Sequence, residues 1–365
     1  MLEVADVLRR AGDAYLQKYG ATMLPSHRRA LHDLRHCRTA VLGGQVYCCD
    51  RCGHRQYAYH SCKNRHCPKC QGDDTERWLA ERRGELLDVP YFHLVFTLPE
   101  ALRPLVRRHQ QLLYGVLLKA AANSLMKLAA DPRYVGGRIG MLAILHTWTT
   151  TMAYHPHVHL LVPGGGVRED GVWVAARKDY LVPVVPLAQI FRGLFLSLLN
   201  QALPHEPIPS SVRSQPWVVY CKPTVQGTDK VLQYLARYVH RVAFANSRLV
   251  RVTDDHVTFH YQDRRHRQWK TMTLKAEEFL RRFLQHVLPR GTHKVRYYGI
   301  WHPSQRALLR RVQLATWREP IPTASADEGW LGSTDPESAR DRKCPCCGEG
   351  TLRLIETLTR QRAPP

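Results

Sequence analysis

The sequence predicts an α+β protein, in which a small module of helices and a zinc ribbon precedes a split β-α-β-β-α-β antiparallel sheet. Two observations carry this prediction. Segments with strand and helix patterns alternate in that order from Tyr91 to Cys221. Before them, from Gln45 to Gln71, the chain is polar and dense in cysteine, which is typical of a domain that folds around a metal ion.

Composition narrows the class of protein. Of the 365 residues, 44% are hydrophobic, which favours a globular chain, and 53 Lys+Arg against 31 Asp+Glu give a formal net charge of +22. A surplus of this size needs an anionic partner. Nucleic acid is favoured over a membrane surface because aromatic residues alternate with basic ones, as between Lys294 and Trp301. We expect neither a leader peptide nor a segment that spans a bilayer, and we expect the protein to be cytoplasmic.

The first seventy residues contain the predicted zinc site. Apolar spacing predicts helices over 2–18 and from about 26 to 37, with Ser26 as a possible cap of the second. Fourteen residues separate the pair Cys49 and Cys52 from the pair Cys67 and Cys70, which is close to the spacing of a zinc ribbon. Four thiolates satisfy a tetrahedral zinc ion, so we expect these four cysteines to bind one structural zinc.

Other potential zinc ligands remain. The 11 cysteines are an odd number grouped in Cys-x-x-Cys pairs, which in a reducing compartment indicates metal binding rather than disulfides. Unused thiols and imidazoles of the module could hold a second zinc, or be packed thiols and surface histidines. They are Cys37, Cys48, Cys62, His32, His36, His54 and His66. Far along the chain, Cys344-Pro-Cys-Cys347-Gly348 is half of a zinc ribbon with no second pair after it, so a zinc there would need ligands from elsewhere.

The elements of the predicted sheet follow in order. A helix capped by Asp73 or Asp74 leads into them, and basic residues 264–267 occupy a turn between later strands. The expected elements are strand 91–98, helix 100–130, strands 139–149 and 155–163, a hairpin around Asp170, helix 187–203, strand 217–221, three short strands in 248–274, helix 276–288 and strand 294–301. Residues 318–343 have the composition of a linker.

A pair of histidines lies on the second strand of the predicted hairpin. His157 and His159 flank one apolar residue, so strand alternation puts both imidazoles on one face. His146 precedes them by eleven residues, and an antiparallel pairing can bring it beside them. Three imidazoles with open positions are typical of a catalytic metal, although each could instead be a hydrogen-bonded strand residue. Competitors for the third ligand are Gln226, Gln233 and His155.

A predicted helix from residue 228 to 241 carries two tyrosines on one face. Tyr234 and Tyr238 are four residues apart, Lys230 is in line with them, and Arg237 and Arg241 form a neighbouring row. Tyrosines at this spacing are more often packing residues than nucleophiles. A metal bound to a phosphate would make attack by such a phenol feasible, despite the phenol's usual pKa of about 10.

Together these features resemble the HUH-endonuclease transposases of the insertion sequence 91 type, two-tyrosine enzymes that move single DNA strands by a rolling-circle route. The resemblance covers roughly residues 25–312. It is carried by His157-Val158-His159, Tyr234-x-x-x-Tyr238, Phe96-Thr97-Leu98-Pro99, the cysteine module and the order of these parts.

The resemblance implies an HUH nuclease domain and a reaction. Mg²⁺ or Mn²⁺ would be held by His157 and His159 with a third polar ligand, for which His146 is our geometric choice. Tyr234 or Tyr238 would form a 5′-phosphotyrosine and free a 3′-hydroxyl. The substrates would be single-stranded element ends and target DNA, met at the nucleoid of a bacterial cell. Three imidazoles intrinsically favour zinc or another late transition metal over Mg²⁺, so the physiological ion rests on the resemblance.

The expected domains are a helical and zinc-binding DNA-recognition module (1–90), a catalytic domain (91–312), and a linker with a cysteine-containing tail (313–365). Lys230, Arg237 and Arg241 are the expected DNA-binding residues. Four aromatic residues could stack on single strands or belong to the core. They are Tyr297, Tyr298, Trp301 and Trp269. Rival functions are a rolling-circle replication initiator or relaxase and, from another class, a non-catalytic zinc-containing DNA-binding regulator.

Overall fold

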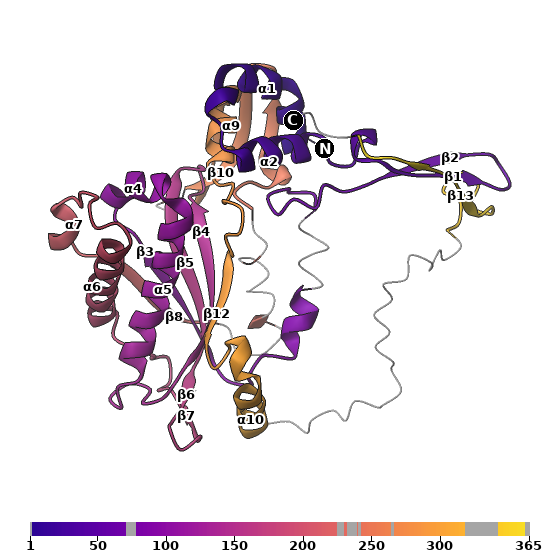
Figure 1. Ribbon diagram of the computed structural model, residues 1–365. Coiled ribbons are helices and arrows are strands. Elements are labelled where there is room, and N and C mark those ends of the chain that lie inside the picture. The colour runs from indigo at the N-terminus through magenta and orange to yellow at the C-terminus, as the bar shows by residue number, and fades with distance from the viewer. Residues whose placement is uncertain are drawn as a thin grey trace.

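The computed structural model describes residues 2–70, 78–224, 230–231, 239, 242–263, 266–317 and 342–361. It has a body built on a central sheet, a group of helices above that sheet, and a narrow arm that projects sideways (Figure 1). The two tyrosines expected to be nucleophiles, together with Arg237 and Arg241, lie outside the described residues.

The central sheet has five antiparallel strands in the order β12-β4-β5-β3-β8. Along the chain, β3, α5, β4, β5, α6 and β8 follow one another, so the sheet is the split β-α-β-β-α-β arrangement predicted from the sequence. The α+β fold class is thereby confirmed. β12 adds a fifth strand beside β4. The bounds are β3 Tyr91–Thr97, β4 Gly140–Trp148, β5 Tyr154–Pro163, β8 Val218–Pro223 and β12 Val295–Gly299.

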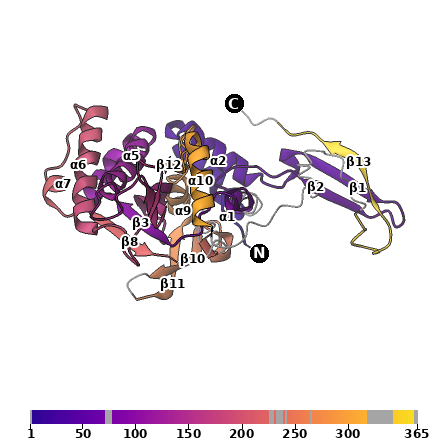
Figure 2. The same cartoon turned by 90° about the horizontal axis from the view of Figure 1, so that it is seen from below.

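Each face of the sheet buries a separate set of apolar side chains. On one face Phe96, Val158 and Leu160 pack against α5 and α6. On the other face Ile144 and Leu161 pack with residues of α10, and Figure 2 shows α5 and α6 on one side of the sheet and α10 on the other. The helices around the sheet are α4 Arg103–Arg108, α5 Gln110–Ala129, α6 Val184–Ala202, α7 Ser211–Ser214 and α10 Arg306–Thr316.

Helix α5 has the length and apolar composition of a membrane span, although no such segment is predicted from the sequence. Of the most apolar 18-residue stretch of α5, 67% is buried. Leu117, Leu118 and Leu125 are fully buried in the core against the sheet. A helix that is apolar on most sides fits the centre of a large core equally well. α5 is a core helix here.

The last strand reaches the sheet through a close backbone approach at Gly299. This residue has φ +64°, and a Cβ built on it would lie 1.8 Å from the carbonyl oxygen of Ile139. Only glycine fits, because any side chain would collide with that backbone. The approach fixes the register of β12 on β4, in which Gly299 lies opposite Gly140.

A second core lies above the sheet and joins distant parts of the chain. Phe244, Phe259 and Phe279 meet edge to face with centroids 5.1–5.9 Å apart, and the apolar faces of α1 and α2 cover them. Residues on both sides of the predicted boundary at residue 90 contribute to this core. The elements are α1 Val4–Tyr19, α2 Pro25–Arg35, β9 Leu249–Val252, β10 His256–Asp263, β11 Gln268–Lys275 and α9 Ala276–Leu284.

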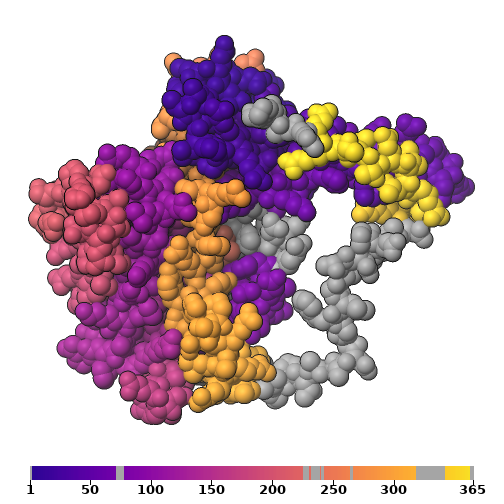
Figure 3. All heavy atoms as spheres, viewed as in Figure 1, coloured from indigo at the N-terminus to yellow at the C-terminus, as the bar shows by residue number. Residues whose placement is uncertain are grey.

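The arm is a three-stranded antiparallel sheet made from both ends of the described chain. Its order is β13-β1-β2, with β1 Gly44–Cys49, β2 Arg55–Tyr59 and β13 Leu352–Leu358. In Figure 3 the yellow C-terminal segment lies against the N-terminal hairpin, away from the body. The tail that we expected to be a linker with cysteines therefore ends as a strand paired with residues three hundred positions earlier.

Several predicted boundaries shift for local reasons. α2 begins at Pro25 with Leu24 as its N-cap, so Ser26 is not the cap: proline already has the backbone angle of a first helical residue. The expected helix 100–130 is divided at His109, whose φ of −115° and ψ of 44° are not helical. The proposed cap residues Asp73 and Asp74 lie outside the described residues. Remaining short elements are β6 Gly165–Val167, β7 Trp173–Ala175 and the 3₁₀ turns Gly20–Thr22, Ala40–Leu42, Glu100–Leu102, Asn246–Arg248 and Pro303–Gln305.

Candidate functional site

Three histidines meet on one face of the central sheet. His146 on β4 lies directly opposite His157 on β5, and His159 is two residues further along β5 on the same face. A ring nitrogen of each lies within 4.8 Å of a ring nitrogen of the other two. The structure thus brings together the three residues expected from strand alternation and hairpin pairing.

Hydrogen bonds at Nδ1 fix the orientation of two of these rings, those of His157 and His159. The Nδ1–H of His157 donates to the carbonyl oxygen of His155 at 2.7 Å, which directs Nε2 toward the cluster. Nδ1 of His159 lies 2.8 Å from Nε2 of His93, on the neighbouring strand β3. Ring planes only 3° apart, with centroids 5.0 Å apart, make this an edge-to-edge hydrogen bond between coplanar imidazoles.

Burial lowers the pKa of His93 to about 4, so its imidazole is neutral at pH 7. A neutral imidazole can accept the Nδ1–H of His159, and His159 then presents Nε2 to a metal. His93 is not among the site residues predicted from the sequence. The signal was present in its position on the strand preceding the hairpin, whose residues 93, 95 and 97 share one face.

The donor set fits a divalent cation. The three imidazoles would supply three ligands and leave coordination positions open for substrate oxygens. Imidazole donors suit zinc and other late transition metals, whereas Mg²⁺ prefers oxygen ligands. His155, a competitor for the third position, does not belong to the cluster, because its Nδ1 lies 2.9 Å from an Arg103 guanidinium nitrogen. Gln226 and Gln233 lie outside the described residues.

A pocket of about 410 Å³ is linked to the histidine cluster through Trp148. Trp148 connects the two sites: it lines the pocket, and its ring stacks on His146 with centroids 4.6 Å apart and planes at 21°. The Lys294 ammonium lies 5.2 Å above the Trp148 ring and lines the same pocket, as do Arg65 and Trp78. Basic and aromatic groups around one hollow suit a nucleotide, whose phosphate is anionic and whose base has a π face.

The ends of the tyrosine segment reach the same sheet face as the histidines. Val231 and Val239 are buried, in one apolar cluster with Ile144 and Leu161. Lys294 also donates to the carbonyl oxygen of Val239 at 3.1 Å. Tyr234 and Tyr238 fall between these two anchored valines and outside the described residues, whereas Lys230 is described and exposed.

The four candidate stacking residues differ in exposure. Trp301 belongs to the core, where it stacks on Tyr91 with centroids 6.0 Å apart. Tyr297 and Tyr298 are half-buried, and burial raises the pKa of each phenol. Trp269 on β11 is 66% exposed. Trp269 is therefore the most accessible of the four for stacking on a nucleic-acid base.

The cysteines form two clusters, and this corrects the single zinc ribbon expected from the sequence. Cys67 and Cys70 meet Cys37 and Cys62, whereas Cys49 and Cys52 meet two cysteines of the tail. The spacing of the two N-terminal pairs is therefore misleading, because β1 and β2 carry the first pair out along the arm, away from the second. His66, a further candidate, belongs to neither cluster, and its Nε2 accepts the backbone N–H of Leu288 at 3.3 Å.

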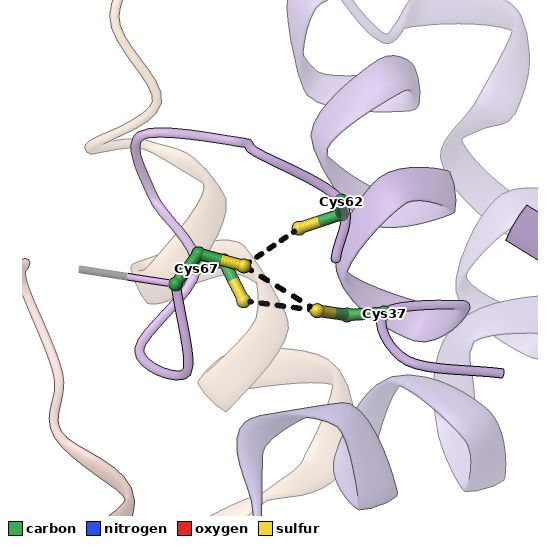
Figure 4. Close-up of side chains that lie close together, drawn as sticks. Cys37, Cys62 and Cys67 are labelled. Atoms are coloured by element: carbon green, nitrogen blue, oxygen red, sulfur yellow. Dashed lines mark hydrogen bonds between the residues drawn. The ribbon is translucent and has the colours of Figure 1, made fainter. Parts of the chain in front are cut away.

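The cluster at the base of the arm has zinc-like dimensions. Its sulfurs lie 3.5 Å (Cys37–Cys70), 3.6 Å (Cys62–Cys70) and 3.7 Å (Cys37–Cys67) apart, and Figure 4 shows Cys37, Cys62 and Cys67 directed at one another. A zinc ion with Zn–S bonds of about 2.3 Å separates tetrahedral sulfurs by about 3.8 Å. Disulfide sulfurs would be about 2.0 Å apart. The four thiols fit one structural zinc.

Two protein families match the chain, one over the histidine-bearing sheet and one over the N-terminal cysteines. Residues 140–307 match a family described as a putative transposase, and residues 7–98 match a transposase zinc-binding domain. The first match contains the three histidines, and the second contains the cluster at the base of the arm.

Two similar proteins extend the match over most of the chain. The putative transposase y4qJ of Sinorhizobium fredii (strain NBRC 101917 / NGR234) is 40% identical over 388 aligned positions, which cover 100% of this chain and 97% of that protein. The transposase for insertion sequence element IS801 of Pseudomonas savastanoi pv. phaseolicola is 32% identical over 280 positions, 72% of this chain and 67% of that protein.

Among solved structures, the N-terminal origin-recognition/nickase domain of non-structural protein 1 from human bocavirus aligns with 65% of this chain and 98% of its own. The identity is 13% and the TM-score 0.24, which is too low to argue a shared fold. The family rests on the domain matches and on the two relatives. With an N-terminal zinc-binding domain followed by a transposase domain, and with these two relatives, the chain belongs to the insertion sequence 91 family of transposases.

Proposed function

We propose that this transposase nicks and rejoins single DNA strands at the ends of its element, through a tyrosine nucleophile and a divalent metal bound by His146, His157 and His159. The observation that carries the proposal is the convergence of these imidazoles on one sheet face. The segment with Tyr234 and Tyr238 starts and ends on that face, because Val231 and Val239 are buried there.

The chain's residues would divide the reaction between them. A bound metal would supply charge neutralisation at the scissile phosphate and make the phosphorus more electrophilic. The oxygen of Tyr234 or Tyr238 then bonds to phosphorus as its phenol proton is lost, and the bond from phosphorus to the 3′ oxygen breaks. That oxygen takes up a proton and leaves as a 3′-hydroxyl, so the 5′ end is held as a phosphotyrosine.

Rejoining reverses the same step. A 3′-hydroxyl of another strand attacks the phosphotyrosine and releases the phenol, so the phosphodiester bond is conserved without an added energy source. Two tyrosines allow two such linkages on one chain, as rolling-circle transposition requires. We place this activity in the bacterial cytoplasm, at the nucleoid.

Electrostatics favours a single-stranded substrate. The net charge of +22 supplies counter-charge for phosphates, and the exposed Lys230 directly precedes the anchored Val231. The pocket with Trp148 and Lys294 beside His146 suits one unpaired nucleotide next to the scissile phosphate. Mg²⁺ or Mn²⁺ is our choice of ion by family resemblance, although three imidazoles favour later metals.

The decisive experiment is a search for a covalent adduct. Labelled single-stranded DNA with an element end is incubated with the protein and Mg²⁺ or Mn²⁺, then separated under denaturing conditions. We expect the 5′ product to migrate with the protein, and the adduct to disappear in Tyr234→Phe/Tyr238→Phe. The matched control Tyr180→Phe/Tyr220→Phe changes two exposed tyrosines and should retain it. An adduct that survives in the first variant contradicts the proposal.

The same assay separates the rival functions. A non-catalytic regulator would bind DNA without forming any adduct. A replication initiator or relaxase would form the adduct at a plasmid origin in preference to an element end. His157→Ala should abolish cleavage and retain DNA binding, whereas loss of folding in that variant would indicate a structural role for the histidine.

A further inference from the structure

We propose that the arm holds a zinc ion of its own, bound by Cys49 and Cys52 from β1 and its turn and by Cys344 and Cys347 from the tail. Ligand sulfurs of all four lie within 4.8 Å of one another. Cys49–Cys347 are 3.8 Å apart and Cys52–Cys344 are 3.7 Å apart, close to the edge of about 3.8 Å expected for a ZnS₄ tetrahedron.

The two halves of this cluster have the same local backbone. In the first, Gly53 N–H donates to the Cys49 carbonyl at 3.1 Å; in the second, Gly348 N–H donates to the Cys344 carbonyl at 2.9 Å. Gly53 and Gly348 have φ of +68° and +72°, a region that favours glycine. The repeated pattern Cys-x-x-Cys-Gly therefore encodes two matching turns, each with a cysteine pair at its tip.

Backbone N–H groups point at the sulfurs of this cluster. Cys49 Sγ accepts the N–H of Arg51 at 3.4 Å and that of Cys52 at 3.5 Å. In the other turn, Cys344 Sγ accepts the N–H of Cys346 at 3.4 Å. Such N–H···S contacts suit sulfurs that coordinate a metal ion.

Gly350 contacts two of the ligand sulfurs, those of Cys347 and Cys49. Cys347 Sγ accepts the N–H of Gly350 at 3.3 Å. A Cβ built on Gly350 would lie 2.3 Å from Cys49 Sγ, so a side chain at this position would enter the ligand sphere. Gly350 thus brings the tail's backbone against the N-terminal pair of cysteines.

The arm has too little apolar core to hold its two segments together alone. Its buried apolar cluster consists of Cys49, Cys344 and Leu352, with Tyr47 and Cys347 packed against them. So small a cluster buries far less surface than independent folding needs, and in such domains metal binding supplies the folding free energy. The zinc would join the tail to the N-terminal hairpin in the way that a cross-link does.

This site extends beyond the recognised zinc-binding domain, which spans residues 7–98 and contains Cys49 and Cys52. That match ends at residue 98 and lacks both tail ligands. Cys346, which lies between the tail ligands in sequence, is exposed and does not belong to the cluster. Cys346 therefore offers a matched control one position away from a ligand.

The first test is the zinc content of the purified full-length chain. Because the histidine cluster can also take up zinc, the measurement compares variants: Cys346→Ser should hold as much zinc as the wild type, and Cys344→Ser/Cys347→Ser one ion fewer per chain. The second variant should also expose the tail to limited proteolysis. A zinc content equal to that of the wild type in Cys344→Ser/Cys347→Ser, or one ion lost in Cys346→Ser, would overturn the proposal.

A second measurement needs no variant, so it does not depend on whether a substituted arm folds. The zinc-loaded wild-type protein is alkylated under native conditions, with and without a chelator, and its cysteine peptides are quantified. Cys344 and Cys347 should be protected until the chelator is added, whereas Cys346 should react at once. Equal reaction of all three in the zinc-loaded protein would refute a zinc ion in the arm.

Discussion

His93 Nε2 and His159 Nδ1 lie 2.8 Å apart across two neighbouring strands, in rings that are coplanar within 3°. This hydrogen bond gives the second histidine of the pair a fixed orientation before any metal arrives. Groups that hold a metal's ligands in this way commonly affect affinity by about 10–100-fold.

The first prediction follows from that contact. His93→Ala should raise the metal concentration needed for half-maximal nicking by about 10–100-fold, with most of the rate restored at saturating metal. Activity measured across a metal titration checks it, and exposed His205→Ala is the control. A lowered maximal rate with an unchanged metal requirement would show that His93 does not act through His159.

The third ligand can be identified by comparing His146→Ala with His155→Ala. His146 belongs to the cluster, so its loss should weaken metal binding by about 100-fold or more. This exceeds the usual effect of losing a residue that only hydrogen-bonds to a metal ligand. His155 contacts Arg103 instead, so its loss should weaken binding less. Calorimetric titration with Mn²⁺ measures both. The reverse order of affinities would assign the third position to His155.

Lys230 gives a prediction about DNA binding. If this exposed side chain neutralises one phosphate, Lys230→Gln should reduce the slope of log affinity against log salt by about 0.7 for single-stranded DNA. Fluorescence anisotropy over a salt series measures that slope. Exposed Lys178→Gln should leave it unchanged. An unchanged slope in Lys230→Gln would remove this residue from the DNA interface.

Buried neutral histidines predict how stability depends on pH. Burial lowers the pKa of His66 and of His286 to about 3, against 6.5 ordinarily. The unfolded chain therefore takes up protons first as pH falls, and stability present above pH 6.5 is lost progressively toward pH 3. Each such group contributes a slope of about 1.4 kcal/mol per pH unit in this window.

The variant His286→Gln isolates one of these groups. Glutamine can still donate to the carbonyl oxygen of Met152, which the Nε2 of His286 contacts at 3.1 Å, but it does not titrate. Denaturant unfolding at pH 7 and pH 5 should show a smaller loss of stability in this variant than in wild type. Exposed His260→Gln should behave as wild type, and an equal loss in all three proteins would count against the mechanism.

The core shared by α1, α2 and residues 244–284 predicts a stability difference within one sheet. Phe259 on β10 is fully buried, so Phe259→Ala should lower the free energy of unfolding by about 3–5 kcal/mol. Trp269 on neighbouring β11 is 66% exposed, so Trp269→Ala should cost less than about 0.5 kcal/mol. Equal costs would show that this core contributes little to stability.

The sheet and its histidines could be predicted because their signals are local. Alternation along residues 155–163 assigns His157 and His159 to one face, and a short hairpin brings His146 beside them. His93 escaped prediction because its strand neighbours β5 only in the folded sheet, where Val95 lies opposite His159. Sequence order alone does not give that pairing.

The cysteine pairing failed for a different physical reason. Two Cys-x-x-Cys pairs fourteen residues apart fit a local zinc ribbon, and spacing cannot show which thiols a sheet will carry away. The glycine after Cys52 and after Cys347 was the available signal, because both glycines have positive φ and their two turns match. The pair Cys67 and Cys70 is followed by glutamine instead.

The pairing of β1 with β13 sets an order for biosynthesis. β1 and β2 leave the ribosome early, but their third strand and two of the cysteines beside them come only after residue 343. α1 and α2 likewise wait for Phe244 to Phe283 before their apolar faces are covered. β1, β2, α1 and α2 therefore complete their packing only after much later segments have been made, and a nascent chain interrupted before β13 would display an unpaired strand edge and reactive thiols to the quality-control machinery.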